Sequence, residues 1–371
     1  MKTTWLLILL LLVGAGADER PRARELGLKP GLYQPGPNNA ITDVAGVLVG
    51  QVTLVRGEGK LVPGQGPVRT GVTAILPCAD PWTRRFAAGT FILNGNGEMT
   101  GLAYLDDMAW LETPILLTNT LNVGKVADAC IEWLIEHHPE IGVEDDVPIP
   151  VVAECDDSTL NDIQGRHVGP AEVKLALDGA RSGPVQEGAC GGGTGMIAYG
   201  YKAGTGTSSR VTPGGYTVGV LVQANMGDRE EFTVLGRPVG KLLEGEPIAR
   251  RTEGSIVFVV ATDAPLNASQ LRRLARHTAH GLARTGAITH NGSGDLAIAF
   301  STRNAITRNQ ESGELPMVGL SNASLNPLYQ ATVEATEEAI LNALCKAQTT
   351  TGRDGVVAPA VPLERLRALL P

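Results

Sequence analysis

The sequence predicts a layered α/β sandwich in which strands form the centre and helices cover the outside. Seven short apolar runs are interpreted as strands, and most of them are continuous rather than alternating, which is typical of strands buried on both faces. Three longer segments carry apolar residues at helical spacing. The chain has 371 residues, of which 43% are hydrophobic, so it is long enough to bury a core between such layers.

The predicted strands are distributed along the whole chain, and no internal repeat is present. They are Val44–Val49, Gly71–Leu76, Thr90–Leu93, Pro148–Val152, Tyr216–Gln223, Ser255–Ala261 and Asp295–Ser301.

The predicted helices are Val126–His137, Ala268–Arg284 and Gln330–Ala347. The second is the best defined, because Asn267 is a suitable N-cap, Gln270 stands at the third helical position, and Gly286 follows the end. The third carries three acidic residues in its first half, an arrangement that suits the helix macrodipole: Glu334, Glu337 and Glu338.

Residues 1–17 have the features of a secretory signal peptide. Lys2 gives a positive start, Trp5–Val13 is an unbroken apolar run, and Ala15-Gly16-Ala17 supplies small residues for cleavage. A membrane anchor is the alternative, but the run is about half of the roughly 20 residues that cross a bilayer. We therefore expect an exported mature chain, residues 18–371, that is periplasmic or secreted and no longer attached to a membrane.

Composition excludes or disfavours several classes of function. A net charge of −8 and an aromatic content of 4% argue against a nucleic-acid partner. The five cysteines are widely spaced, which favours a role as buried apolar residues, although one disulfide is possible.

The usual catalytic motifs HExxH and GxSxG do not occur. The segment Gly95–Gly101 has the spacing GxGxxxG, which does not match a dinucleotide loop. No metal or cofactor site is indicated, and His277 with His280 is more simply an exposed or capping pair.

Two polar stretches, 56–66 and 236–253, are expected to be exposed, and the second leads directly into Gly254-Ser255. A hydrolase without a usable histidine can employ a serine at a new chain N-terminus, because the α-amine has a pKa of about 7.7–8.0 and can accept the hydroxyl proton. Gly254 has no side chain to block attack on its carbonyl. The alternative is an ordinary junction between a loop and a strand.

An ordered set of segments makes the interpretation specific. The segments are NNAITDVAGVLVGQVTL from Asn38, VRTGVTAILP from Val68, AGTFILNGNGEMTGL from Ala88, VVAECDDSTLNDI from Val151, YTVGVLVQANMG from Tyr216, GSIVFVVATDAPL from Gly254, GLARTG from Gly281, NGSGDLAIAFST from Asn291 and TGRDG from Thr351. Together they resemble the family of L-aminopeptidase/D-esterases and β-peptidyl aminopeptidases, which are self-processing serine hydrolases. The resemblance covers nearly the whole mature chain.

The resemblance implies a single domain with a four-layer αββα sandwich, similar to the N-terminal nucleophile hydrolases but with different connectivity. It implies cleavage between Gly254 and Ser255 into an α chain, residues 18–254, and a β chain, residues 255–371, which stay associated. Members of the family assemble as multimers of αβ units, commonly tetramers, and no metal or organic cofactor is expected.

The same resemblance assigns site residues. Ser255 matches the nucleophile, Asn225 matches the amide of the oxyanion hole, and Ser293 with Asp295 matches a pair that orients the nucleophile's amine and hydroxyl. The best-known members carry Glu where Asp295 stands, so we expect a longer or water-mediated contact with the Ser255 amine. A carboxylate pair, Asp156 and Asp157, is expected either to attract the substrate's ammonium group or to cap a turn.

We therefore expect an exported, self-cleaving serine aminopeptidase, amidase or esterase that acts through an acyl-enzyme on short substrates with a free amine. Two alternatives from other classes stay open. An acyltransferase of the ornithine-acetyltransferase type uses a related architecture, but Ser255 in place of Thr and the signal peptide count against it. A non-enzymatic exported binding protein would have an uncut chain.

Overall fold

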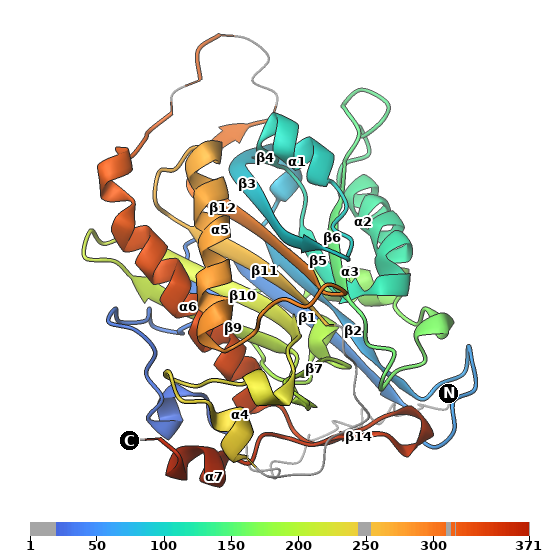
Figure 1. The fold of residues 1–371 in the computed structure, drawn as a ribbon. Coiled ribbons are helices and arrows are strands. Elements are labelled where there is room, and N and C mark those ends of the chain that lie inside the picture. The colour runs from blue at the N-terminus through green and yellow to red at the C-terminus, as the bar shows by residue number, and fades with distance from the viewer. Residues whose placement is uncertain (1–19, 244–253, 309–312, 316, 371) are drawn as a thin grey trace, which may run out of the picture.

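The computed structural model describes residues 20–243, 254–308, 313–315 and 317–370 (Figure 1). The predicted signal peptide, residues 1–17, lies outside the described residues, as does the segment 244–253 of the second polar stretch. Among the described residues, no helix has the length and apolar character needed to cross a bilayer.

Two β-sheets lie face to face at the centre of the molecule. The larger has six strands in the order β4-β3-β12-β11-β10-β9, and the smaller has four in the order β1-β2-β5-β6. Neighbouring strands run antiparallel, except that β11 pairs parallel with β12 and β5 pairs parallel with β6. The strands are β1 (Leu48–Arg56), β2 (Val68–Leu76), β3 (Arg84–Gly95), β4 (Trp110–Leu111), β5 (Ile115–Asn119), β6 (Val151–Cys155), β9 (Thr205–Val211), β10 (Thr217–Asn225), β11 (Ser255–Thr262) and β12 (Gly294–Thr307).

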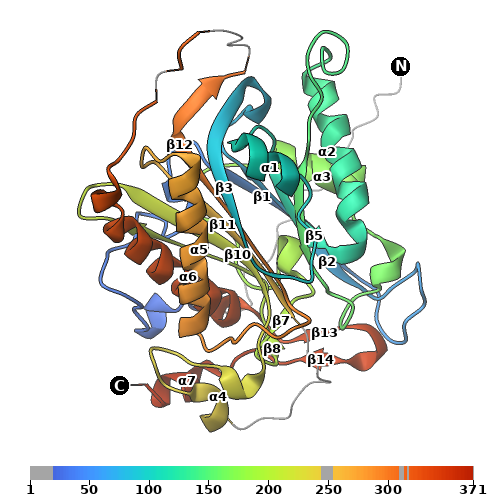
Figure 2. The same cartoon turned by 45° about the horizontal axis from the view of Figure 1, so that its top comes forward.

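Helices cover the outer face of each sheet, as Figure 2 shows. Helices α5 (Ala268–Arg284) and α6 (Asn326–Lys346) pack on the six-stranded sheet, and α2 (Val123–His137) and α3 (Pro170–Asp178) pack on the other. The described elements therefore form the expected αββα layers. The remaining elements are short: α1 (Leu102–Met108), α4 (Val239–Leu242), α7 (Leu363–Ala368) and the hairpins β7–β8 (Ile197–Ala198, Tyr201–Lys202) and β13–β14 (Thr350–Thr351, Val357–Ala358).

The central core lies between the two sheets. Ile75 and Leu117 of the smaller sheet and Leu221, Val259 and Ile298 of the larger belong to one cluster of fully buried side chains. Burying each such side chain contributes about 1.5–3 kcal/mol. Every residue of β2, β5, β6 and β11 is buried, which confirms that the continuous apolar runs are strands covered on both faces.

Helix α5 has the bounds that the sequence predicts, and its N-cap is formed as expected, because Asn267 Oδ1 accepts the main-chain N–H of Gln270. Two strands, β1 and β6, begin three or more residues later than expected. Gly46, with φ of 93°, makes a turn before β1. Proline has no N–H for a ladder, and β6 begins at Val151, directly after Pro150.

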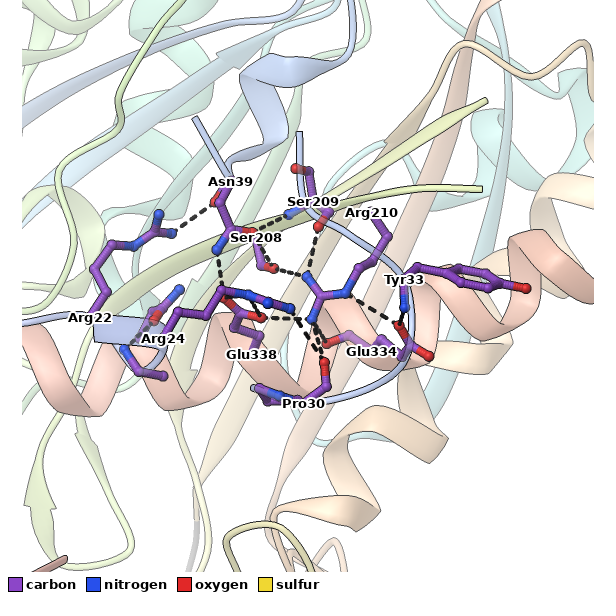
Figure 3. A network of polar contacts seen from close by, with 12 residues as sticks. Arg22, Arg24, Pro30, Tyr33, Asn39, Ser208, Ser209, Arg210, Glu334 and Glu338 are labelled. Carbon is purple, nitrogen blue, oxygen red and sulfur yellow. Dashed lines mark hydrogen bonds and ion pairs between the residues drawn. The ribbon is translucent and has the colours of Figure 1, made fainter. Parts of the chain in front are cut away.

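Strand β9 escapes prediction because it is polar, yet all but its last residue are buried. Its Arg210 is wholly buried and donates to Glu338 at 2.6 Å and to Glu334 at 3.3 Å on α6 (Figure 3). Arg24, in the segment that leads into the domain, also pairs with Glu338. The expectation that these acidic residues serve the helix macrodipole was wrong, because α6 begins at Asn326 and its first turn has no acidic residue. Glu334 and Glu338 balance the charges of guanidinium groups instead.

Two further expectations are settled by burial. All five cysteines are free, and all but Cys78 are buried, so they are small apolar core residues and the disulfide left open does not form. The polar stretch from Gly236 was expected to be exposed, and most of its described residues are. The exceptions include Val239 and Leu243, on and beside α4, whose apolar side chains belong to the core.

Candidate active site

Three adjacent strands of the larger sheet bring the candidate nucleophile and its neighbours together. Ser255 is the first residue of β11 and lies opposite Asn225, the last residue of β10. On its other side it lies opposite Gly294, the first residue of β12. Ser255 is only 7% exposed and Asn225 only 6%. The pairing of the strands therefore fixes the position of the Ser255 side chain, at the end of an inner strand of the sheet.

The peptide bond before Ser255 is tightly enclosed. The main-chain N–H of Gly294 lies 3.2 Å from the carbonyl oxygen of Gly254 and 3.3 Å from Ser255 Oγ. A Cβ at residue 254 would lie 2.4 Å from the Asn225 carbonyl oxygen, which no side chain tolerates. Glycine at this position is therefore required by space in the uncut chain.

Asn225 is held at both ends of its side-chain amide. Its Oδ1 accepts the main-chain N–H of Ile197 at 2.9 Å, and its Nδ2 donates to the carbonyl oxygen of Asp156 at 3.0 Å. Because Oδ1 accepts from a main-chain donor, the two contacts fix which end of the amide is the nitrogen. Nδ2 carries two N–H donors and the Asp156 carbonyl takes one, so the second can serve another acceptor, as an oxyanion donor must.

Ser293 and Asp295 form a buried pair at the start of β12. The Ser293 hydroxyl donates to Asp295 Oδ1 at 2.7 Å, and Asp295 is 1% exposed. Burial raises the pKa of Asp295, and the hydrogen bond from Ser293 opposes that shift. The second oxygen, Oδ2, is buried and has no hydrogen-bond partner among the described residues.

The two acidic residues expected to attract an ammonium group are placed differently from each other. Asp157 is wholly buried and accepts from Asn161 at 2.9 Å and from Asn119 at 3.1 Å. Burial raises its pKa to about 7. Asp156 is partly exposed, and its carboxylate accepts the Ser158 N–H at 2.7 Å. These contacts favour the turn-holding alternative for both carboxylates, and Asp156 reaches the site through its main-chain carbonyl.

A third acidic residue of the same segment, Glu154, was not singled out from the sequence. It lies within the buried strand β6, accepts the Glu98 N–H at 3.0 Å and bonds the Thr120 hydroxyl. A Cβ at Gly97 would lie 3.2 Å from both Glu154 Oε1 and Gly294 Cα, so the carboxylate lies close to the Ser255 surroundings. Burial raises its pKa. A lone glutamate in an apolar strand is the signal that points to it.

The loop Gly95–Gly101 packs against the turn that carries Ser293. Asn96 donates from its main chain to the Ser293 carbonyl at 3.3 Å and from its side chain to the Gly292 carbonyl at 2.6 Å. The two backbones approach closely here, since a Cβ at Gly97 would lie 3.2 Å from Gly294 Cα and one at Gly294 would lie 2.6 Å from the Asn96 carbonyl oxygen. Among the described residues, no group of His, Cys, Asp and Glu side chains is arranged to hold a metal ion.

Comparisons with known proteins agree with this geometry. The model of peptidase family S58 matches residues 39–358. The β-peptidyl aminopeptidase BapA of Sphingosinicella microcystinivorans is 46% identical, over 97% of this chain and 94% of that protein. The solved L-aminopeptidase D-Ala-esterase/amidase of Ochrobactrum anthropi is 44% identical, with a TM-score of 0.89 over 95% of this chain and 98% of that one. The PH0078 protein of Pyrococcus horikoshii gives a TM-score of 0.90 at 46% identity, over 94% of this chain and 98% of that one.

The Ochrobactrum enzyme is described as a prototype for the serine aminopeptidases and as a new variant of the Ntn hydrolase fold. With the fold and likeness established along almost the whole chain, the protein is a serine aminopeptidase with an Ntn-like hydrolase fold. It belongs to peptidase family S58.

Proposed function

We propose that the protein is an exported aminopeptidase that cleaves its own chain between Gly254 and Ser255 and then removes N-terminal residues from short peptides, amides or esters. The observation that supports this most is the single N–H of Gly294, which contacts both the Gly254 carbonyl oxygen and Ser255 Oγ. A donor at the carbonyl and a hydroxyl beside it are the two parts that an internal acyl shift requires.

In the proposed self-cleavage, Ser255 Oγ attacks the carbonyl carbon of Gly254. The C–N bond breaks, the hydroxyl proton passes to the departing nitrogen, and an ester joins Gly254 to the serine oxygen. Water then hydrolyses the ester, which leaves the carboxylate of Gly254 and the free α-amine of Ser255. The buried and unpartnered Oδ2 of Asp295 is the acceptor we assign to that amine.

In the proposed peptidase reaction, the new α-amine accepts the Ser255 hydroxyl proton while Oγ attacks the substrate carbonyl. Asn225 Nδ2 stabilises the developing oxyanion, a contribution typically of about 2.7–4 kcal/mol. The leaving amine takes the proton, and water releases the acyl group. No step of this sequence calls for a metal or cofactor.

Recognition of the substrate's free amine is assigned to Glu154 rather than to the expected pair Asp156 and Asp157. Glu154 is a buried carboxylate beside the Gly97–Gly294 contact. Asp157 has no exposed surface and is fully engaged by asparagine amides. An ammonium bound by Glu154 would orient the scissile carbonyl toward Ser255.

The relatives guide the choice of substrates to test. One is named a β-peptidyl aminopeptidase and another an L-aminopeptidase and D-Ala-esterase/amidase. We include peptides with an N-terminal β-amino acid among the proposed substrates.

Export after cleavage near Ala17 and assembly of αβ units into a homo-oligomer, such as a tetramer, remain part of the proposal. Arg20 donates to the carbonyls of Cys345 and Val361, so the chain packs against the domain shortly after the proposed signal peptide.

The test is intact-mass analysis of the purified protein under denaturing conditions. The proposal expects two species, one ending at Gly254 and one beginning at Ser255, and hydrolysis of aminoacyl amides by the same sample. The variant Ser255→Ala should give one uncut and inactive chain. As a control, Ser301→Ala alters a serine of the same sheet that donates to the Ala264 carbonyl, and it should leave cleavage intact.

Two fragments in the Ser255→Ala variant would refute cleavage by the chain itself. A wild-type chain that stays uncut on long incubation and is not acylated by a serine-reactive probe would refute the nucleophile. Transfer of the acyl group to an added amine in preference to water would indicate an acyltransferase.

A further inference from the structure

A buried lysine lies behind the site and has no part in the chemistry described above. Lys202, at the end of β8, has no exposed surface. Its Nζ donates to three main-chain carbonyl oxygens: Met196 at 2.7 Å, Ala203 at 2.7 Å and Gly193 at 3.3 Å. An ammonium group has three N–H donors, so all of them are used.

This arrangement is unusual because the charge is balanced by carbonyl dipoles alone. Lys202 makes no ion pair with any carboxylate that the structure describes. Burial lowers the pKa of Lys202 to about 7, and nearby Cys190 and Asp157 oppose that shift. Burying an amine without a carboxylate partner costs free energy. Such groups persist where the surrounding structure stabilises them or where function needs them.

One peptide group joins the carbonyl oxygens around Lys202 to the candidate active site. The carbonyl of Met196 accepts from Lys202, and the N–H of the same peptide unit, which belongs to Ile197, donates to Asn225 Oδ1 at 2.9 Å. A peptide group is planar, so fixing its oxygen fixes the direction of its N–H. A cation at the oxygen also polarises the group and strengthens the N–H as a donor.

We propose that Lys202 is a positioning residue for the serine aminopeptidase site: its ammonium fixes the Met196–Ile197 peptide, and that peptide holds the Asn225 amide with Nδ2 toward the reacting carbonyl. The inference rests on the oxyanion role that the proposed function gives to Asn225. Lys202 itself touches neither Ser255 nor the substrate in this scheme.

The main-chain N–H of Ala203 also donates to the Met196 carbonyl, at 3.1 Å. Loss of Lys202 should therefore weaken the orientation of Asn225 without abolishing it. Removal of an oxyanion donor typically costs about 10²–10³ in kcat. We expect Lys202→Met, which keeps an unbranched four-atom stem and removes the ammonium group, to lower kcat by roughly tenfold, a part of that range, with KM nearly unchanged.

The experiment is a double-mutant cycle between Lys202→Met and Asn225→Ala, measured as kcat and KM on an aminoacyl amide. If Lys202 acts through Asn225, Lys202→Met should cost little in the Asn225→Ala background. Lys174→Met, at an exposed lysine on α3, is the matched control and should leave kcat unchanged. Should Lys202→Met fail to fold, Lys202→Gln, which keeps two N–H donors without charge, takes its place in the cycle.

The outcomes separate the inference from the proposed function. If Asn225→Ala alone leaves kcat unchanged, the oxyanion role fails and the inference fails with it. If Asn225→Ala is deleterious but the two losses multiply, Lys202 only stabilises the fold and the inference is wrong. A crystal structure of the Lys202 variant should show a displaced Asn225 amide; an unmoved amide would also overturn it.

Discussion

The N–H of Gly294 lies 3.3 Å from Ser255 Oγ, and the same N–H lies 3.2 Å from the oxygen of the peptide bond that precedes the serine. This relationship follows from the parallel pairing of β11 with β12, in which Ser255 and Gly294 are opposite residues. It requires glycine at 294, because the backbone of Asn96 passes close behind it.

Replacing Gly294 by alanine should therefore impair both reactions of the site. The added Cβ would lie 2.6 Å from the Asn96 carbonyl oxygen, so β12 must move away and carry the N–H with it. We expect slower self-cleavage and a loss in kcat of about 10²-fold, as for removal of one oxyanion donor. Fragment formation and amide hydrolysis provide the measurements. Gly319→Ala, at a position with open space around it, should have neither effect; normal rates in Gly294→Ala would contradict the assignment.

Replacing Ser293 by alanine should shift the pH dependence of activity. The Ser293 hydroxyl stabilises the charged form of Asp295 and opposes the rise in pKa that burial causes. Its loss raises the pKa of Asp295 further, so the carboxylate becomes protonated at higher pH. Profiles of kcat/KM against pH should show the acidic limb displaced to higher pH. Ser293→Thr, which keeps the hydroxyl, should restore the limb, and an unshifted limb in Ser293→Ala would show that Asp295 is not the titrating group.

Replacing Glu154 by glutamine should weaken binding of substrates with a free amine. A hydrogen bond to a charged group contributes about 1.5–3 kcal/mol, so KM should rise by about tenfold or more. Substrates with a blocked amine are the internal comparison and should respond little. Asp156→Asn should change KM less than Glu154→Gln does, because the Asp156 carboxylate bonds the Ser158 N–H of its own turn, whereas Glu154 lies beside the Gly97–Gly294 contact. A larger effect at Asp156 would return the ammonium site to the residues expected from the sequence.

Replacing Glu338 by glutamine should destabilise the fold without a direct effect on the site. Glu338 is buried and pairs with both Arg210 and Arg24 (Figure 3). Its neutral form takes the ion-pair partner from Arg24 and leaves the buried Arg210 with the longer contact to Glu334. Breaking a buried pair of this kind costs about 3–5 kcal/mol. Denaturant unfolding measures the loss. Glu136→Gln, which removes an exposed partner of Lys174, is the control and should leave the midpoint almost unchanged.

The wholly buried strands and the amphipathic helix α5 could be predicted because their patterns are local. An apolar run such as 255–261 predicts a buried strand without any knowledge of the rest of the fold. Asn267 caps α5 through a residue only three positions away. Strand β9 could not be predicted in this way. Partners from distant parts of the chain allow its polar residues to be buried: Asn39 and Asp43 bond its serines. The acidic residues of α6 pair with Arg210.

The candidate site shows the same division. The sequence alone determined the fold class, the residues aligned with the nucleophile and its neighbours, and the Gly254-Ser255 junction, since these depend on residue types in an ordered set of segments. Only the tertiary structure decided that the Glu154 carboxylate lies beside the Gly97–Gly294 contact and that the Asp157 carboxylate is buried among asparagine amides. It also revealed that the Met196–Ile197 peptide joins Lys202 to Asn225. These relationships depend on distances between strands and loops far apart in the sequence, and packing alone sets those distances.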